Sequence, residues 1–187
     1  ITSTGRSGAI IFAANSGPVT ANGNVMTSNN ASGQTFYANT CQNVAMQNNT
    51  ITINDPVGST IGWRNHVVDL YFAAGTTTFH TNTMTLNGSA ALESTFFHAV
   101  NVQGNVEGSL AMTNNTLQGN QVGQESAGVR LRNPLASTQN FDICNNYING
   151  FTYGIRSDKL ASGINVDANE NNLENNEYGA YASAEGA

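Results

Sequence analysis

The sequence predicts an all-β protein, a parallel β-solenoid of about six full coils with three strands in each coil. Three observations predict this fold: a repeat of 25 to 33 residues, an alternation of apolar and polar positions within each copy, and Asn residues that recur at fixed places. Internal repeats of this length are typical of stacked supersecondary units. We therefore expect residues 1–187 to form a single repeat domain, and a fragment of a longer solenoid, because both ends break off inside a coil.

Two columns of Asn mark the corners of the predicted coils. In each copy an Asn is followed two residues later by an apolar residue, and five residues later by a second Asn, except where Phe151 stands. The first column contains Asn24, Asn49, Asn82, Asn115, Asn146 and Asn171, and the second contains Asn29, Asn54, Asn87, Asn120 and Asn176. An Asn amide both donates and accepts, so it can bond to the same amide one coil away, at the ~4.8 Å spacing of strands. Asn also tolerates the left-handed backbone of a sharp corner. Both columns are therefore expected to form structural ladders.

The segment before each first-column Asn is predicted to be a strand. The positions five and three residues upstream of the Asn are mostly apolar, and the position between them is small or polar. This middle position holds Thr20, Ala45, Thr78, Ala111, Asp142 and Asp167. A period of two indicates a strand with one face directed inward, whereas a helical period would not leave a polar residue at every alternate place.

Two more strands complete each predicted coil. The second strand carries the apolar residue that follows the first Asn, namely Met26, Ile51, Met84, Leu117, Ile148 or Leu173. The third strand is suggested by the segments 128–131, 154–156 and 179–181, each of which begins with Gly. The apolar segment 9–12 is expected to be the same strand of a preceding, incomplete coil. Three strands per coil is therefore the expected cross-section.

The stretch from Asn145 to Ile155 resembles the repeat of right-handed parallel β-helices of the pectate-lyase-like superfamily, and the resemblance extends over essentially the whole chain. It implies a right-handed coil. The superfamily includes polysaccharide lyases, glycoside hydrolases, phage tailspikes and passenger regions of bacterial surface proteins, and a fold alone does not select among them. Within the last group, the segments 7–10, 12–15 and 36–39 are similar to tetrapeptides of chlamydial polymorphic membrane proteins. The resemblance thus favours a passenger or adhesin segment of an autotransporter.

Composition limits the environment and the partners. Charged residues make up 10% of the chain, the net charge is −6 and the pI is near 4.8. Nucleic acid is not an expected partner, because phosphates require basic stripes. No stretch approaches the ~20 apolar residues of a membrane-spanning helix. We expect an extracellular or cell-surface location on a bacterium, and open strand edges at the ends could allow the chain to associate with itself.

A surplus of residues in the longer coils is expected to leave the cross-section as loops. One such loop lies between Asp55 and Val67 and carries the only Trp of the chain; its candidate binding residues are Trp63, Arg64 and His66. Aromatic, guanidinium and imidazole groups on a protruding loop suit contact with a host-surface protein or a glycan. The alternative is that Trp63 folds back to cover the flank of the solenoid. The leading expectation is an adhesin or scaffold without catalysis and without a cofactor.

The main alternative is an enzyme that degrades acidic polysaccharides, or a tailspike-like protein. Asp142 and Asp167 share one outward column on neighbouring coils, so that their stems should lie ~5 Å apart. Two carboxylates so close would titrate together or share a cation. With Arg156 and Lys159 they form the most enzyme-like set in the chain, although a plain exterior charge pair is the simpler interpretation.

Other residue patterns predict no catalytic or metal site. His66, His80 and His98 fall at unlike offsets within their coils, so no metal cluster is expected. Cys41 and Cys144 lie at different places of the cross-section, about four coils apart, and are predicted to be free thiols. Thr columns after the first Asn are similar to ice-binding solenoids, but they are interrupted at Tyr147 and Gln118, which makes ice binding a distant alternative.

Overall fold

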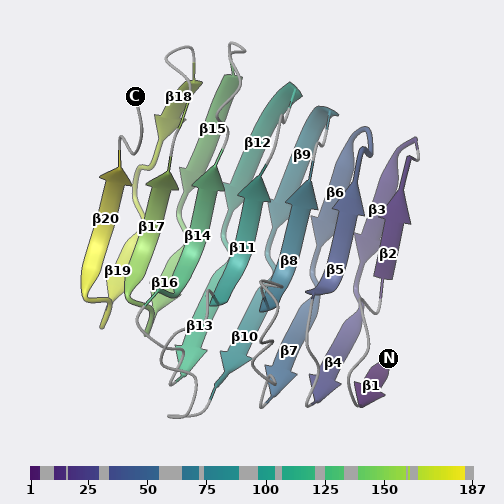
Figure 1. Cartoon of the computed structure of the whole chain (residues 1–187), viewed down its shortest axis with the longest axis horizontal. Helices are drawn as coiled ribbons and strands as arrows, with labels where there is room; N and C mark the ends of the chain where they lie inside the picture. Colours follow the sequence, from purple (N-terminus) through teal and green to yellow (C-terminus); the bar gives the residue numbers. More distant parts are fainter. Residues whose placement is uncertain are drawn as a thin grey trace.

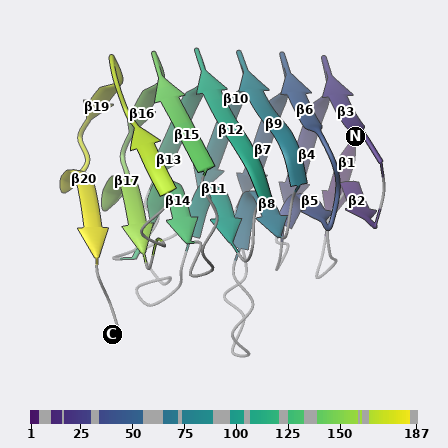
Figure 2. The same cartoon turned by 90° about the horizontal axis from the view of Figure 1, so that it is seen from above.

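The protein is a right-handed parallel β-helix, seen in a computed structural model that describes residues 1–4, 11–15, 17–29, 34–54, 65–71, 74–88, 97–103, 107–120, 125–132, 139–158, 160 and 164–183. Its strands form three sheets in which each strand pairs with those one coil before and after it. Figures 1 and 2 show the strands stacked along the long axis, with the two termini at opposite ends. All strand pairs between the described residues are parallel, as predicted.

Each sheet contains one strand from every coil. The first sheet contains β1 (Thr2–Thr4), β4 (Val25–Asn29), β7 (Thr50–Asn54), β10 (Thr83–Asn87), β13 (Thr116–Asn120), β16 (Tyr147–Asn149) and β19 (Asn172–Glu174). The second contains β2 (Ile11–Ala14), β5 (Gln34–Asn39), β8 (Asn65–Tyr71), β11 (Phe97–Gln103), β14 (Ala127–Arg132), β17 (Tyr153–Asp158) and β20 (Tyr178–Ser183). The third contains β3 (Val19–Asn22), β6 (Val44–Gln47), β9 (Ala74–His80), β12 (Glu107–Thr113), β15 (Gln139–Cys144) and β18 (Ile164–Asp167). Strand β1 was not among the sequence predictions.

The residue columns read from the sequence coincide with the observed strand register. In the first sheet Met26 pairs with Ile51, and the same column continues through the later coils. In the third sheet the small or polar middle column runs in register from Thr20 to Asp167. The alternation with period two therefore assigned each of these side chains to the correct face.

The inward columns build one apolar core along the axis. Its largest fully buried side chains include Phe36, Phe79, Phe141, Met26 and Met46. Complete burial of such a side chain stabilises the folded state by about 1.5–3 kcal/mol. Because each coil contributes its own set of these residues, the core is built by coil-on-coil packing, as in other solenoids.

The first Asn column is a continuous ladder from Asn24 to Asn171, and its inner members, Asn49 to Asn146, are buried. Nδ2 of each Asn donates to Oδ1 of the Asn in the next coil at 2.9–3.0 Å. The same Nδ2 donates to a backbone carbonyl of the preceding coil, for example from Asn82 to Met46. Each Oδ1 also accepts the backbone N–H of the Asn one coil earlier. An inner amide such as that of Asn82, which is 1% exposed, thereby satisfies all its donors and acceptors without water.

The left-handed corner residue is the one that precedes each ladder Asn, not the Asn itself. This position has a φ between 54° and 67° in every coil and is occupied by Gly23, Asn48, Thr81, Asn114, Asn145 and Glu170. The sharp turn therefore comes one residue before the place where the sequence suggested it. The turn directs the next side chain inward, where its amide joins the ladder.

The second Asn column forms a shorter ladder of opposite direction. Here Nδ2 of each later Asn donates to Oδ1 of the earlier one, along the series Asn29, Asn54, Asn87 and Asn120. The expectation that Asn176 continues this ladder is wrong, because Phe151 separates it from Asn120 and offers no amide. Asn176 bonds instead to backbone groups of the preceding coil, namely the N–H of Phe151 and the carbonyl of Ile148.

Cys41 and Cys144 are not joined by a disulfide, as predicted. Cys41 is buried and Cys144 is partly buried, and neither takes part in a disulfide.

Among the described residues there is no helix, and so none that could cross a bilayer.

Candidate functional site

The structure separates the residues of the expected enzyme-like set. Asp142 and Asp167 pair in register on β15 and β18, and both are exposed on the outward face of the third sheet. Arg156 lies on β17, in the second sheet. Lys159 lies outside the described residues. The predicted register of Asp142 with Asp167 is confirmed, but Arg156 forms ion pairs with a different group of side chains.

The expected loop residues are only partly described. Trp63 and Arg64 lie outside the described residues. The expectation that His66 is exposed on a loop is wrong, because His66 belongs to β8 and is fully buried. Its ring stacks on that of His98 in the next coil, with centroids 4.9 Å apart and planes 9° apart. The two imidazoles pair in register, so their offsets are alike, contrary to the sequence interpretation.

A polar column that includes the candidate residue Arg156 runs along the outward face of the second sheet. In register, its members are Tyr37, Asp69, Asn101, Arg130, Arg156 and Tyr181. The side chains three residues before the members of this column lie on the same face. The hydrogen bond of Gln34 to Asp69 and the stacking of Arg156 on Tyr153 demonstrate this. Asp69, Asn101 and Arg130 are at most 4% exposed. The middle of the column is therefore a buried polar network and its last coils are open to solvent.

Asp69 accepts hydrogen bonds from three amides in neighbouring coils. Asn101 donates to Oδ1 at 2.8 Å, and Gln34 donates to Oδ2 at 3.0 Å. Gln103 adds a longer contact of 3.3 Å to Oδ1. Such donors stabilise a buried carboxylate, since an ionised group without hydrogen bonds is costly in the interior. Asp69 together with burial also raises the pKa of the Tyr37 hydroxyl, burial being the larger cause.

Asp158 joins two arginines from adjacent coils. Arg130 donates through Nε to Oδ2 at 2.8 Å, and Arg156 donates through Nε to Oδ1 at 2.9 Å. Nη1 of Arg156 also contacts Glu125. Burial tends to raise the pKa of Asp158, but the hydrogen bonds from the two arginines outweigh it and the pKa is lowered. Burial likewise opposes the charge of Arg156, yet its bonds to Asp158 and Glu125 raise the pKa of the guanidinium.

We expect Asp158→Asn to lower the free energy of unfolding by about 2 kcal/mol at pH 7, because it leaves Arg130 buried without its counter-charge. A carboxylate with a depressed folded pKa contributes stability above its unfolded pKa of about 4, and this is lost as the pH falls through the folded value. The difference between wild type and variant should therefore shrink between pH 5 and 2, measured by urea unfolding at several pH values.

The exposed Asp142→Asn is the control, and its effect should stay within about 0.5 kcal/mol. A loss for Asp158→Asn that is equally large at pH 7 and at pH 2 would show that the charge of Asp158 is not responsible.

Three tyrosines and one arginine form a tyrosine–arginine cluster on the outward face of β17 and β20, consisting of Tyr153, Arg156, Tyr178 and Tyr181. The ring of Tyr153 stacks on that of Tyr178, with centroids 5.3 Å apart, and lies 5.1 Å from that of Tyr181. The guanidinium carbon of Arg156 lies 4.7 Å from the centroid of Tyr153. Contacts of these kinds add to the stability of packed aromatic groups. Burial, followed by the charge of Glu125, raises the pKa of Tyr153.

The sequence contains a signal for this cluster in the residues beside two glycines of the third strand. Tyr153 and Tyr178 stand immediately before Gly154 and Gly179, and Arg156 and Tyr181 stand two residues after those glycines. Since the glycines were already assigned to equivalent places of the third strand, the aromatic residues beside them had to stack. Glu125 carried no such signal, because it belongs to no repeated position.

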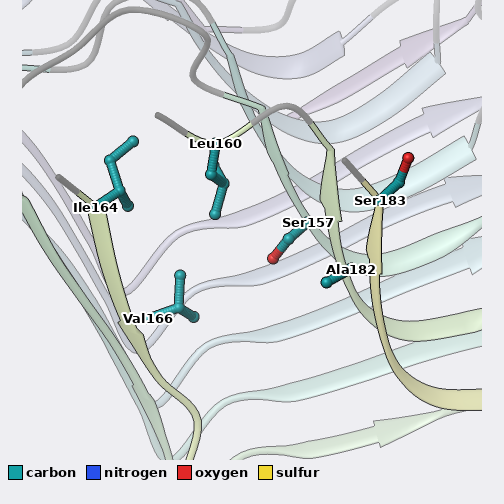
Figure 3. Close-up of a pocket in the computed structure, with 6 residues that line it drawn as sticks. All are labelled: Ser157, Leu160, Ile164, Val166, Ala182 and Ser183. Atoms are coloured by element: carbon teal, nitrogen blue, oxygen red, sulfur yellow. The ribbon is translucent and has the colours of Figure 1, made fainter. Parts of the chain in front are cut away.

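A cavity of about 420 Å³ lies inside the last coil, lined by Ser157, Leu160, Ile164, Val166, Ala182 and Ser183. Figure 3 shows these side chains between β17 and β20 on one side and β18 on the other. Ser157 and Ala182 occupy the column that holds Leu70, Val102 and Leu131 in earlier coils. These smaller side chains leave space that larger ones fill in the earlier coils.

The outward face of the first sheet carries the Thr columns. Thr50, Thr83 and Thr116 are in register, as are Thr27, Thr52 and Thr85. The first column ends at Tyr147 and the second at Gln118, as the sequence indicated.

Comparison of the chain with protein-family models, with curated proteins and with solved structures gives no match.

Proposed function

We propose that the chain is a non-catalytic β-helical segment of a secreted or surface-displayed bacterial protein, and that it acts as an adhesin or scaffold. Its resemblance to pectate-lyase-like repeats, and more weakly to chlamydial polymorphic membrane proteins, supports a passenger segment of the autotransporter type. The partner would be a molecule of the host surface that contacts the outward faces and loops, where Trp63 and Arg64 remain candidates.

The exposed tyrosine–arginine cluster is the observation that carries this proposal. Tyr178 and Tyr181 are 46% and 41% exposed, unlike most large apolar side chains among the described residues. Tyr and Arg are enriched among the residues that dominate binding energies at interfaces. The ladders and the strand pairing hold these side chains on a rigid frame, which reduces the conformational entropy that binding would remove.

The alternative function, degradation of acidic polysaccharides, has weaker support from the arrangement of side chains. Asp142 and Asp167 lie on the third sheet, and Arg156 lies on the second, where two carboxylates already engage it. Among the described members of the expected site, the two acids and Arg156 therefore lie on different sheets.

Binding of the fluorescently labelled protein to cultured epithelial cells tests the proposed function. We expect saturable binding that excess unlabelled protein displaces and that heat-unfolded protein does not show. Binding at the level of the unfolded control would contradict the proposal.

Incubation with polygalacturonate separates the adhesin from the enzyme. Unsaturated uronides are detected by their absorbance, and we expect that none form. Product that accumulates with the wild-type protein and disappears with Asp167→Asn would favour the enzyme instead.

A further inference from the structure

The tyrosine–arginine cluster combines exposed aromatic faces with polar groups that are already fixed in place. Tyr153 and Arg156 are half-buried and are held by stacking and by ion pairs, whereas Tyr178 and Tyr181 on the next coil present more of their surface to solvent. The geometry is a two-by-two array, because Tyr153 pairs with Tyr178 and Arg156 pairs with Tyr181 in the strand register. Such an array offers a ligand two neighbouring rings, those of Tyr178 and Tyr181, with centroids 6.2 Å apart and planes inclined by 54°.

Polar groups border the array on the side of β17. Glu125 contacts Nη1 of Arg156, and its side chain remains 41% exposed. A carboxylate and a guanidinium side by side can accept hydrogen bonds from one hydroxyl and donate them to another. Aromatic faces beside a few fixed polar groups are typical of sites for small polar molecules that also have apolar surface.

The ion-pair network that holds Arg156 balances its own charges, and Arg132 adds one positive charge near Arg130. Arg130 and Arg156 contribute two positive charges, and Asp158 and Glu125 contribute two negative charges, all joined in one network of ion pairs. An anionic polysaccharide would need cations that carboxylates do not already neutralise. A neutral ligand has no such requirement.

We propose that the tyrosine–arginine cluster is a subsite for a neutral saccharide chain. The apolar C–H faces of successive sugar rings lie on Tyr178 and Tyr181, while Glu125 and Arg156 hydrogen-bond to sugar hydroxyls. This subsite would bind the ligand of the proposed adhesin, and its biological role rests on that proposed function. Saccharide binding itself can be measured independently.

Titration of the protein with defined oligosaccharides tests the subsite. The neutral probes are cellohexaose, chitohexaose and mannohexaose, and the anionic probes are polygalacturonate and heparin. We expect at least one neutral probe to bind, and Tyr178→Ala and Tyr181→Ala each to raise its Kd about tenfold or more. Tyr178→Phe and Tyr181→Phe keep the rings and should bind within about threefold of wild type.

Tyr147→Ala is the matched control, because Tyr147 lies on the outward face of the first sheet and bonds to Glu174, away from the cluster. It should leave the Kd unchanged, and circular dichroism should show that all variants are folded. Binding of anionic probes alone, no binding of any neutral probe, or unchanged binding by both Ala variants would overturn the subsite.

The cell assay distinguishes failure of the subsite from failure of the proposed function. If neither Ala variant differs from wild type in the oligosaccharide titration and both bind cells as wild type does, the subsite is overturned and the adhesin proposal stands. If neutral probes bind through the cluster but no cells are bound, the adhesin proposal alone is overturned.

Discussion

Replacement of Asn82 by Ala is expected to lower the free energy of unfolding by about 4 kcal/mol, since four hydrogen bonds in a buried environment depend on this side chain. Its Oδ1 accepts from the backbone N–H and the Nδ2 of Asn49, and its Nδ2 donates to Asn115 and to the carbonyl of Met46. In the variant those partners remain inside the coil without access to water. Removal of one member therefore leaves several polar groups unsatisfied at once.

Urea unfolding followed by circular dichroism measures this loss, with the slope of the transition checked in both proteins. Asn120→Ala is the matched control, because Asn120 also belongs to a ladder but is exposed. Its loss should be about 1 kcal/mol or less, since water can replace its bond to Asn87. Equal losses for Asn82→Ala and Asn120→Ala would contradict the role assigned to burial.

Gly108→Ala is expected to lower the free energy of unfolding by about 4 kcal/mol, because a methyl group cannot be accommodated at this position. A Cβ at residue 108 would lie 1.7 Å from the carbonyl oxygen of Gly75 in the paired strand. The φ of Gly108 is +150°, a region that residues with side chains rarely adopt. The clash requires β9 and β12 to move apart, which would disrupt their hydrogen bonds, and the unfavourable φ adds to the cost.

Thermal unfolding measures the effect of Gly108→Ala, and Gly179→Ala is the control variant. Gly179 also lies within a strand, but a Cβ there would meet only Leu173, at an ordinary contact distance of 3.5 Å. We expect its unfolding midpoint to change by no more than about 4 °C. An unchanged midpoint for Gly108→Ala would mean that the two strands separate at little cost.

The fold could be predicted from the sequence where the distance between repeated residues is constant. Between the first Asn column and the strands on either side of it the spacing does not vary, so one alignment fixed two sheets and their faces. The inward Asn residues reinforced that alignment, because a buried amide needs an equivalent partner one coil away. The turn at residues such as Asn48 was displaced by one position because the tolerance of Asn for a left-handed backbone does not say which of two adjacent Asn residues adopts it.

The second sheet was harder to align because segments of different length precede it. Val129 follows Asn120 by nine residues, whereas Val100 follows Asn87 by thirteen, although both occupy the same place of the strand. The register of His66 with His98, and of Asp69 with Asn101, was therefore hidden. Burial added a second difficulty, since alternation indicates which side chains leave the core but not whether they reach solvent. Arg130 has an outward position and is nevertheless buried.

The opposite directions of the two Asn ladders have an electrostatic consequence for the rod. In the first ladder the amide-to-amide bonds are donated toward the C-terminal end of the axis, and in the second they are donated toward the N-terminal end. The electric moments of the two rows of amides consequently oppose each other over the coils that contain Asn29 to Asn120. The field of one row offsets part of that of the other, so the two rows together polarise the rod less than either row would alone.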